Sequence, residues 1–184
     1  MIHLNAFLSL HPLTPADHPA HATLMRRIYP PAFAYLWPDG GEWYLETYHG
    51  REAFEGDLAE DNCPYYHVHL EGKPIGILWL RLHAPDPDHP ELPGLKLERI
   101  YLDPSITGRG IGSYLMNYVK AAGRRLGKAL VWLERMDSNE STIRFYRRQG
   151  FTRGGAFSFG HGPMYAHLRD MHRLAYFLQP ETRP

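Results

Sequence analysis

The segment from Leu97 to Gly112 constrains the fold of this chain more than any other part of the sequence. It reads Leu-Glu-Arg-Ile-Tyr-Leu-Asp-Pro-Ser-Ile and then Thr-Gly-Arg-Gly-Ile-Gly, and it leads into an amphipathic run. This order predicts a strand, a glycine-rich turn and a helix. The first N–H groups of a helix have no partners inside it, and the helix dipole adds partial positive charge there. The segment therefore indicates a site for a phosphate-bearing ligand.

Length and charge limit the classes of protein that fit. The 184 residues suit one domain, predicted to cover residues 1–184, with a full hydrophobic core. The formal net charge is zero with histidine neutral, which argues against nucleic acid or a membrane surface as a partner. No apolar run reaches the roughly 18 residues of a membrane span.

The chain has one cysteine, Cys63, so it forms no intrachain disulfide, and this is consistent with a reducing cytoplasm. The context Asp-Asn-Cys-Pro indicates a loop cysteine rather than a catalytic thiol. Ala20-His21-Ala22 resembles a signal-cleavage site, but the residues before it lack lysine and arginine and contain several prolines. We therefore expect no signal peptide and a cytoplasmic protein.

Hydrophobic periodicity and turn residues predict the order of elements. A helix from Pro15 to Tyr29 is capped by Thr14 and stopped by Pro30-Pro31, and Asp137 with Glu140 suggests a capping box for the last helix. Glu71-Gly72 indicates a hairpin turn. The expected strands are 6–13, 64–70, 73–83, 95–102, 129–134, 151–159 and 167–178. The other expected helices are 51–61, 110–126 and 138–149. We expect a loop at 84–93 and frayed structure in the last six residues.

The order of strands and helices predicts an α/β fold with a mixed sheet and helices on both faces. The helix 110–126 has an apolar face of Ile111, Leu115, Val119, Ala122 and Leu126. The strand after it, 129–134, is a nearly continuous apolar run, as in a sheet that is covered on both sides.

A second motif follows the glycine-rich one, Asn-Glu-Ser-Thr-Ile-Arg-Phe-Tyr-Arg-Arg-Gln-Gly-Phe over residues 139–151. With Gly108-Arg109-Gly110-Ile111-Gly112, it resembles the coenzyme-A-binding core of the GNAT superfamily of N-acetyltransferases. More narrowly, residues 97–102 and Glu42-Trp43-Tyr44 resemble the spermine/spermidine-type bacterial acetyltransferases. The resemblance implies the GNAT fold: a mostly antiparallel, twisted sheet of about seven strands that is splayed at the coenzyme site.

The resemblance also implies acetyl-CoA as cosubstrate, with its pyrophosphate in the glycine-rich loop. The glycines keep side chains away, so backbone N–H groups approach the phosphates, and Arg109 adds a positive charge. Thr107 is shorter than the glutamine or arginine usual in the family, so its side-chain contact is open. The implied coenzyme-binding residues are Ile100, Tyr101, Leu102, Thr107, Gly108, Arg109, Gly110, Ile111, Gly112, Ser113 and Asn139.

Other phosphate-binding motifs fit less well. The spacing Gly-x-Gly-x-Gly is not the Gly-x-Gly-x-x-Gly of dinucleotide sites, and no Gly-Lys-Ser or Gly-Lys-Thr occurs. A purely structural glycine turn is the remaining alternative for the loop. In the family, the pantetheine arm lies along the preceding strand, and backbone groups of residues 100–102 bind it and stabilise the oxyanion. Core packing of Ile100 and Leu102 is compatible with that role.

Two side chains have the chemistry that acetyl transfer needs. Tyr146 is protonated at neutral pH, and the resemblance implies that it is the general acid for the departing thiolate. Glu98 is the candidate base for the acceptor ammonium, directly or through water. The alternatives are an aromatic packing residue for Tyr146 and, for Glu98, a surface carboxylate paired with Arg99 or Lys96. Glu134 is a second candidate carboxylate.

The histidines do not form a metal-binding pattern. His67 and His69 share one face of a strand and His18 and His21 one face of a helix, but no cysteine or carboxylate completes a zinc set. We expect hydrogen-bonded or solvated histidines and no metal. An aromatic group, Tyr35, Trp37, Trp43 and Tyr44, lines the acceptor pocket or packs in the core, and Glu42 and Glu46 are placed to attract a cation.

The sequence thus predicts an acyltransferase that moves an acetyl group from acetyl-CoA to a small primary amine, which includes polyamines. Two alternatives stay open: a protein acetyltransferase acting on an N-terminus or lysine, and a coenzyme-A-binding regulatory module without turnover. A homodimer paired through the C-terminal strand also stays open.

Overall fold

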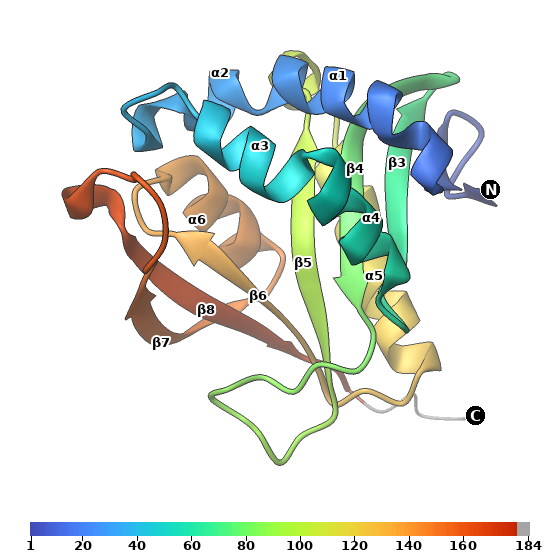
Figure 1. The fold of residues 1–184 in the computed structure, drawn as a ribbon. Helices are drawn as coiled ribbons and strands as arrows, with labels where there is room; N and C mark the ends of the chain where they lie inside the picture. Colours follow the sequence, from blue (N-terminus) through green and yellow to red (C-terminus); the bar gives the residue numbers. More distant parts are fainter. Residues whose placement is uncertain (180–184) are drawn as a thin grey trace. The chain divides into compact units, whose positions relative to one another are not determined.

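The computed structural model describes residues 1–179, and the predicted frayed end lies almost wholly outside them. Its strands form one eight-stranded sheet in the order β1-β2-β3-β4-β5-β6-β8-β7 (Figure 1). The strands are β1 Ile2–His3, β2 Leu8–Pro12, β3 Tyr65–Leu70, β4 Lys73–Arg81, β5 Gly94–Leu102, β6 Leu130–Met136, β7 Thr152–Ser158 and β8 Asp170–Phe177. The helices are α1 His18–Ile28, α2 Pro30–Phe33, α3 Glu42–His49, α4 Arg51–Ala59, α5 Ile111–Arg125 and α6 Glu140–Arg148.

The sheet is mixed and mostly antiparallel, as predicted. β1, β2, β3 and β4 pair antiparallel in sequence, as do β6 with β8 and β8 with β7, whereas β5 and β6 are parallel. The parallel register covers Gly94–Leu97 and Leu130–Leu133, although both strands continue beyond it. The hairpin turn is confirmed, because Glu71 and Gly72 both have positive φ, 51° and 78°. Sequence analysis missed the two-residue β1.

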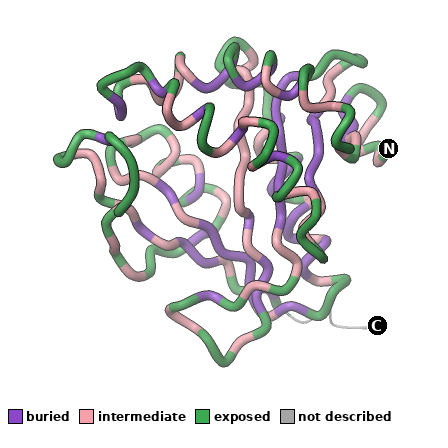
Figure 2. Tube along the Cα trace, viewed as in Figure 1, coloured by how far each residue is buried: buried purple, intermediate pink, exposed green. Residues whose placement is uncertain are grey.

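The chain divides into two compact units. The first contains Met1–Trp79, Arg99–Ile111 and His161–Tyr165, and the second contains Leu80–Glu98, Gly112–Gly160 and Ala166 onward. The prediction of one domain therefore stays a prediction. Long runs of buried residues lie in β3, β4 and β6, which are largely purple in Figure 2.

In the first unit, the structure differs from the sequence-based expectation at the prolines. Pro30 and Pro31 follow the end of α1 but also begin α2, because proline lacks only an N–H that has no partner in a first helical turn. The aromatic stretch after them contains an unpredicted helix, α3. Tryptophan and tyrosine occupy several sides of α3, so its hydrophobic pattern has no clear helical period.

In the second unit, α5 buries Leu115 and Val119 completely, as predicted. Leu126 does not belong to this apolar face and is 43% exposed, because the helix has already ended at Arg125 and Gly127 turns the chain with φ 64°.

β8 lies between β6 and β7, and both of its edges are hydrogen-bonded. The open possibility that a homodimer pairs through this C-terminal strand is therefore excluded, since the strand has no free edge, and a homodimer as such stays a prediction. Within the described residues, none of the helices combines the length and hydropathy of a membrane-spanning segment.

Candidate functional site

The glycine-rich loop has the backbone geometry that its sequence predicts. Gly108 and Gly110 adopt φ 85° and 75°, a region that side chains disfavour, and a Cβ on either would meet no atom within 4 Å. Both glycines are exposed, and α5 begins immediately afterwards at Ile111. The loop therefore leads directly into a helix start whose first N–H groups lack intrahelical partners.

Thr107 is engaged within the loop itself. Its Oγ1 donates to the carbonyl oxygen of Pro104 at 2.8 Å, and its N–H donates to the same oxygen at 3.2 Å. The N–H of Arg109 donates to Ile106 at 3.4 Å, while the Arg109 side chain is exposed. The threonine hydroxyl thus stabilises the turn, which explains how the chain tolerates the short side chain at this position.

Gly112 is required for a different reason from the other two glycines. A Cβ there would lie 3.1 Å from Phe145 Cζ, which is a tighter contact than side chains normally make. The next residue, Ser113, accepts a hydrogen bond at its Oγ from Gln149 Nε2 at 2.9 Å. Gly112 thus has a structural role beside its expected place in the phosphate loop. Its lack of a side chain lets α5 and α6 approach closely.

The end of β5 carries the residues that are expected along the pantetheine arm. Ile100, Tyr101 and Leu102 are partly buried, and the Tyr101 hydroxyl is 2.7 Å from that of Tyr44. Burial, with the neighbouring Tyr44, raises the pKa of Tyr101 well above its usual value. A Cβ on Gly76 of β4 would lie 2.2 Å from the Tyr101 carbonyl oxygen, so a glycine is needed for this close approach.

The N-terminus of α6 is capped by Asn139, and not by the predicted Asp137–Glu140 box. Asn139 Oδ1 accepts from the Thr142 N–H at 3.1 Å and from Ser141 Oγ at 2.8 Å. Asp137 is engaged elsewhere, because its carboxylate is 3.3 Å from Arg135 and 3.2 Å from His172. The Asn139 oxygen is thus already used by the helix, and coenzyme binding by this residue stays a prediction.

Tyr146 lies on α6 and is 7% exposed. Its ring packs edge-on against Phe145 and Phe151. Burial raises the pKa of Tyr146, and the positive charge of Arg135 partly opposes this shift. The raised pKa keeps the hydroxyl protonated at neutral pH, and no hydrogen bond joins it to another residue within 1–179. Packing and a proton-donor role are compatible here.

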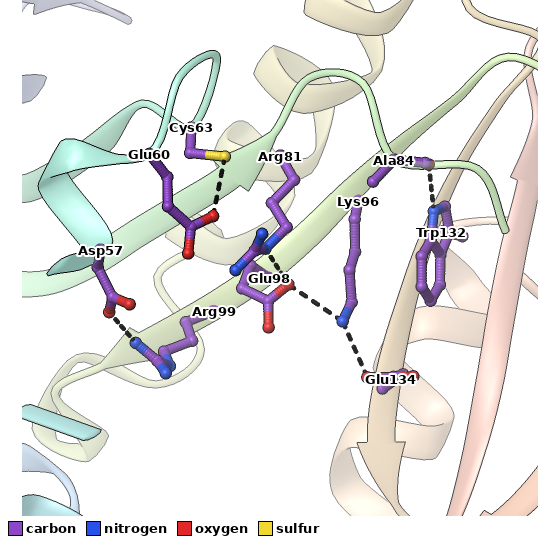
Figure 3. Close-up of polar contacts among 10 residues, drawn as sticks. All are labelled: Asp57, Glu60, Cys63, Arg81, Ala84, Lys96, Glu98, Arg99, Trp132 and Glu134. Carbon is purple, nitrogen blue, oxygen red and sulfur yellow. Dashed lines mark hydrogen bonds and ion pairs between the residues drawn. The ribbon is translucent and has the colours of Figure 1, made fainter. Parts of the chain in front are cut away.

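Glu98 is held between two cations (Figure 3). Its Oε2 lies 3.0 Å from Arg81 Nε and 3.0 Å from Lys96 Nζ. Lys96 also reaches Glu134 Oε2 at 2.9 Å. The alternative interpretation of Glu98 named Lys96 or Arg99 as its partner; Lys96 is the partner, whereas Arg99 pairs with Asp57 at 2.6 Å. The side chain predicted as the base is therefore a carboxylate that an ion-pair network holds in place.

Arg81 and Asp57, the partners of Glu98 and Arg99, are not among the site residues predicted from the sequence. The Lys96–Glu98 contact follows from their i, i+2 spacing on one strand face, but the partners on other elements depend on the sheet register. Arg99 also lies over the Trp79 ring, with its Cζ 4.5 Å from the ring centroid.

The first unit contains a buried pair of hydrogen-bonded histidines, His21 and His49. His21 Nε2 and His49 Nδ1 are 2.9 Å apart, and His18 Nε2 lies 3.2 Å from the His49 carbonyl oxygen. His67 stacks on His21 with ring centroids 5.6 Å apart. Residues 1–179 contain no group of three or more His, Cys, Asp or Glu placed to hold a metal ion.

Trp37, Glu42 and Cys63 have structural partners. Trp37 Nε1 donates to Tyr29 Oη at 2.9 Å, and Glu42 pairs with Arg26 at 2.5 Å. Cys63 is a partly exposed loop cysteine whose thiol lies 3.6 Å from Glu60 Oε2, as Figure 3 shows.

Comparison with known proteins decides the family. The model of the acetyltransferase (GNAT) family matches residues 22–151, which is most of the chain and includes both motifs. The chain belongs to the GNAT acetyltransferase family. An N-acetyltransferase called uncharacterized, from Lactobacillus delbrueckii subsp. lactis, is 30% identical over 118 residues, 63% of this chain and 67% of that protein. The predictions of an acyltransferase enzyme and of acetyl-CoA as its cosubstrate are confirmed.

The mycothiol acetyltransferase of Acidimicrobium ferrooxidans is 30% identical over 155 residues. The match covers 77% of this chain but only 46% of that protein, so this GNAT chain spans less than half the length of that relative.

Solved structures confirm the predicted GNAT fold. The ribosomal L7/L12 α-N-protein acetyltransferase RimL in complex with coenzyme A has a TM-score of 0.72 at 18% identity, covering 96% of this chain and 97% of that one. A mutant of the spermidine N-acetyltransferase SpeG from Vibrio cholerae has a TM-score of 0.63 at 16% identity, covering 95% of each. Because structures of both kinds match, the closeness to spermine/spermidine-type enzymes stays a prediction.

Proposed function

We propose that this GNAT enzyme transfers the acetyl group of acetyl-CoA to a small primary amine. The observation that carries the proposal is the exposed turn with Gly108 and Gly110 at positive φ, which leads straight into the N-terminus of α5. This geometry supplies unpaired N–H groups for a diphosphate. Arg109, exposed at the same turn, adds a positive charge.

The proposed reaction is direct attack. The acceptor ammonium gives a proton to Glu98 or to water that Glu98 orients, and the free amine forms a bond to the thioester carbon. Backbone N–H groups within residues 100–102 stabilise the oxyanion. The nitrogen of the tetrahedral intermediate then loses its second proton, the carbon–sulfur bond breaks, and Tyr146 protonates the departing thiolate. The proton lost from the nitrogen returns through water to the Tyr146 phenolate. The amide and the free thiol of coenzyme A are the products.

The charges around Glu98 bear on the acceptor class. Both Glu98 and Glu134 are already paired with Lys96, and Glu98 also pairs with Arg81. A polyamine is best held by carboxylates that have no other cation. We therefore propose a monoamine as the acceptor in preference to a polyamine. The single cysteine fits the further proposal of a cytoplasmic enzyme.

The test is thiol release from acetyl-CoA, measured across polyamines, amino acids, aminoglycosides and peptides, with the release in the absence of any amine as background. We expect amine-dependent release with a small monoamine, and mass spectrometry should show one acetyl group on that amine. Turnover of peptides alone would identify a protein acetyltransferase. Coenzyme A binding without transfer to any amine would identify a regulatory module. Absence of acetyl-CoA binding in calorimetry at millimolar ligand would refute the proposal.

A further inference from the structure

The ion-pair network around Glu98 contains an unusually placed lysine. Lys96 lies two residues before Glu98 on β5, its side chain is 14% exposed, and its Nζ lies 4.9 Å from the centroid of the Trp132 ring. A nearly buried ammonium is costly unless carboxylates pair with it. Lys96 has two such partners, Glu98 at 3.0 Å and Glu134 at 2.9 Å. Its single charge is therefore shared between two carboxylates.

The two oxygens of Glu98 have different surroundings. Lys96 Nζ and Arg81 Nε both bind Oε2. No group within residues 1–179 bonds to Oε1, and in Figure 3 this second oxygen points away from both cations. The network thus fixes the orientation of the carboxylate through one oxygen and leaves the other available.

The remaining charged groups of the network alternate in sign. Arg173 Nε lies 3.9 Å from Glu134 Oε1, and Arg173 is also 2.9 Å from Asp88. The groups that act on Glu98 are therefore Arg81 on β4, Lys96 on β5 and, through Lys96, Glu134 on β6. Because these side chains are mostly shielded from solvent, a change in one charge is felt by its neighbours more strongly than at a free surface.

We propose that Lys96 is a positioning residue for Glu98. It holds Oε2, leaves Oε1 to accept the proton of the acceptor amine, and divides its charge between Glu98 and Glu134. Without Lys96 the Glu98 carboxylate can turn away from the acceptor amine, so Lys96 acts on turnover through the orientation of Glu98. This inference rests on the proposed function and adds the residue that orients its base.

The experiment compares kcat and the KM for acetyl-CoA of the whole chain at about pH 8 with one monoamine acceptor. Lys96→Met leaves the Glu98 carboxylate free to rotate, so kcat should fall by about tenfold while the KM for acetyl-CoA stays at the wild-type value. Glu134→Gln leaves Lys96 paired with Glu98 and should not lower kcat.

Lys96→Arg keeps a cation beside Glu98 and should restore most of kcat, and Lys73→Met, which changes an exposed lysine of β4, is the matched control. A merely structural role would lower the fraction of folded enzyme without separating kcat from the KM for acetyl-CoA. If Lys96→Met does not fold, Lys96→Gln, which removes the charge but keeps a polar side chain, should show the same loss of kcat. Wild-type kcat in a folded Lys96→Met or Lys96→Gln would overturn this inference alone. A wild type without turnover would instead overturn the proposed function, and with it the basis of this inference.

Discussion

Acid should destabilise this protein through the buried histidines of its first unit. His21, His49 and His67 are 0%, 2% and 6% exposed. Burial, together with the charge of His67, lowers the pKa of His21 from its usual 6.5 to about 3. Burial and His69 lower the pKa of His67 to about 4 although Asp17 opposes this, and burial with Arg99 keeps the pKa of His49 well below its usual value.

The sign of the effect follows from proton linkage. The folded-state pKa values are depressed, so at pH 5 the unfolded chain binds protons that the folded chain does not. The stabilising contribution is present above pH 6.5 and is lost as the pH falls toward 4. For a histidine with an unfolded pKa of 6.5 that stays neutral when folded, lowering the pH from 7 to 5 costs about 2 kcal/mol. The three histidines together cost about 6 kcal/mol, a large part of a typical free energy of unfolding.

Urea unfolding followed by circular dichroism at pH 7, 6 and 5 measures this loss. In His67→Gln, the difference in free energy of unfolding between pH 7 and pH 5 should be smaller than in the wild type by about 2 kcal/mol. His3→Gln removes an exposed histidine of β1 and should leave the difference unchanged. A wild type equally stable at pH 7 and pH 5, or a His67→Gln variant with the wild-type difference, would refute the reasoning.

Three further predictions concern the site and its support. Tyr146→Phe should lower kcat by about 100-fold while acetyl-CoA binding in calorimetry is unchanged, and undiminished turnover would remove Tyr146 from the mechanism. Gly110→Ala should weaken acetyl-CoA binding in calorimetry, because its φ of 75° costs alanine about 1 kcal/mol and the loop relaxes away from this geometry. Asp88→Ala removes the acceptor that lies 2.6 Å from the Gly155 N–H, and urea unfolding should show a loss of about 2 kcal/mol that Asp61→Ala, in an exposed turn, does not show.

Local signals in the sequence were sufficient for several elements. Glu71-Gly72 specifies a tight turn because both positions need positive φ, and the structure has both. The helix after Gly110 was predicted within one residue at each end, because its apolar residues recur at helical spacing and glycines flank it. These features depend on neighbours in the chain, which a sequence displays directly.

The predictions that were wrong or incomplete depend on contacts between residues far apart in the sequence. Asp137 was the expected cap of α6, but Arg135 and His172 bind its carboxylate, and Asn139 takes the cap. For Glu98, the sequence offered Arg99 or Lys96 as the partner in the alternative to the base role, and of these two only Lys96 pairs with it. Arg81 was not named, because it comes from another strand and its contact depends on the pairing of β4 in the sheet.

The cost of the charged network explains why it supports a functional interpretation of Glu98. Apolar residues of similar size at a set of buried ion pairs are often as stable as the charges or more so. The side chains next to these charges in β5, Leu95 and Leu97, are 0% and 2% exposed, so the strand is otherwise built from core residues. Stability alone therefore does not require Glu98 or the lysine that holds it. A carboxylate kept in the sheet with one oxygen fixed and the other available is what a proton acceptor needs. For this reason we propose Glu98 as the base rather than Glu134, whose two oxygens both face cations.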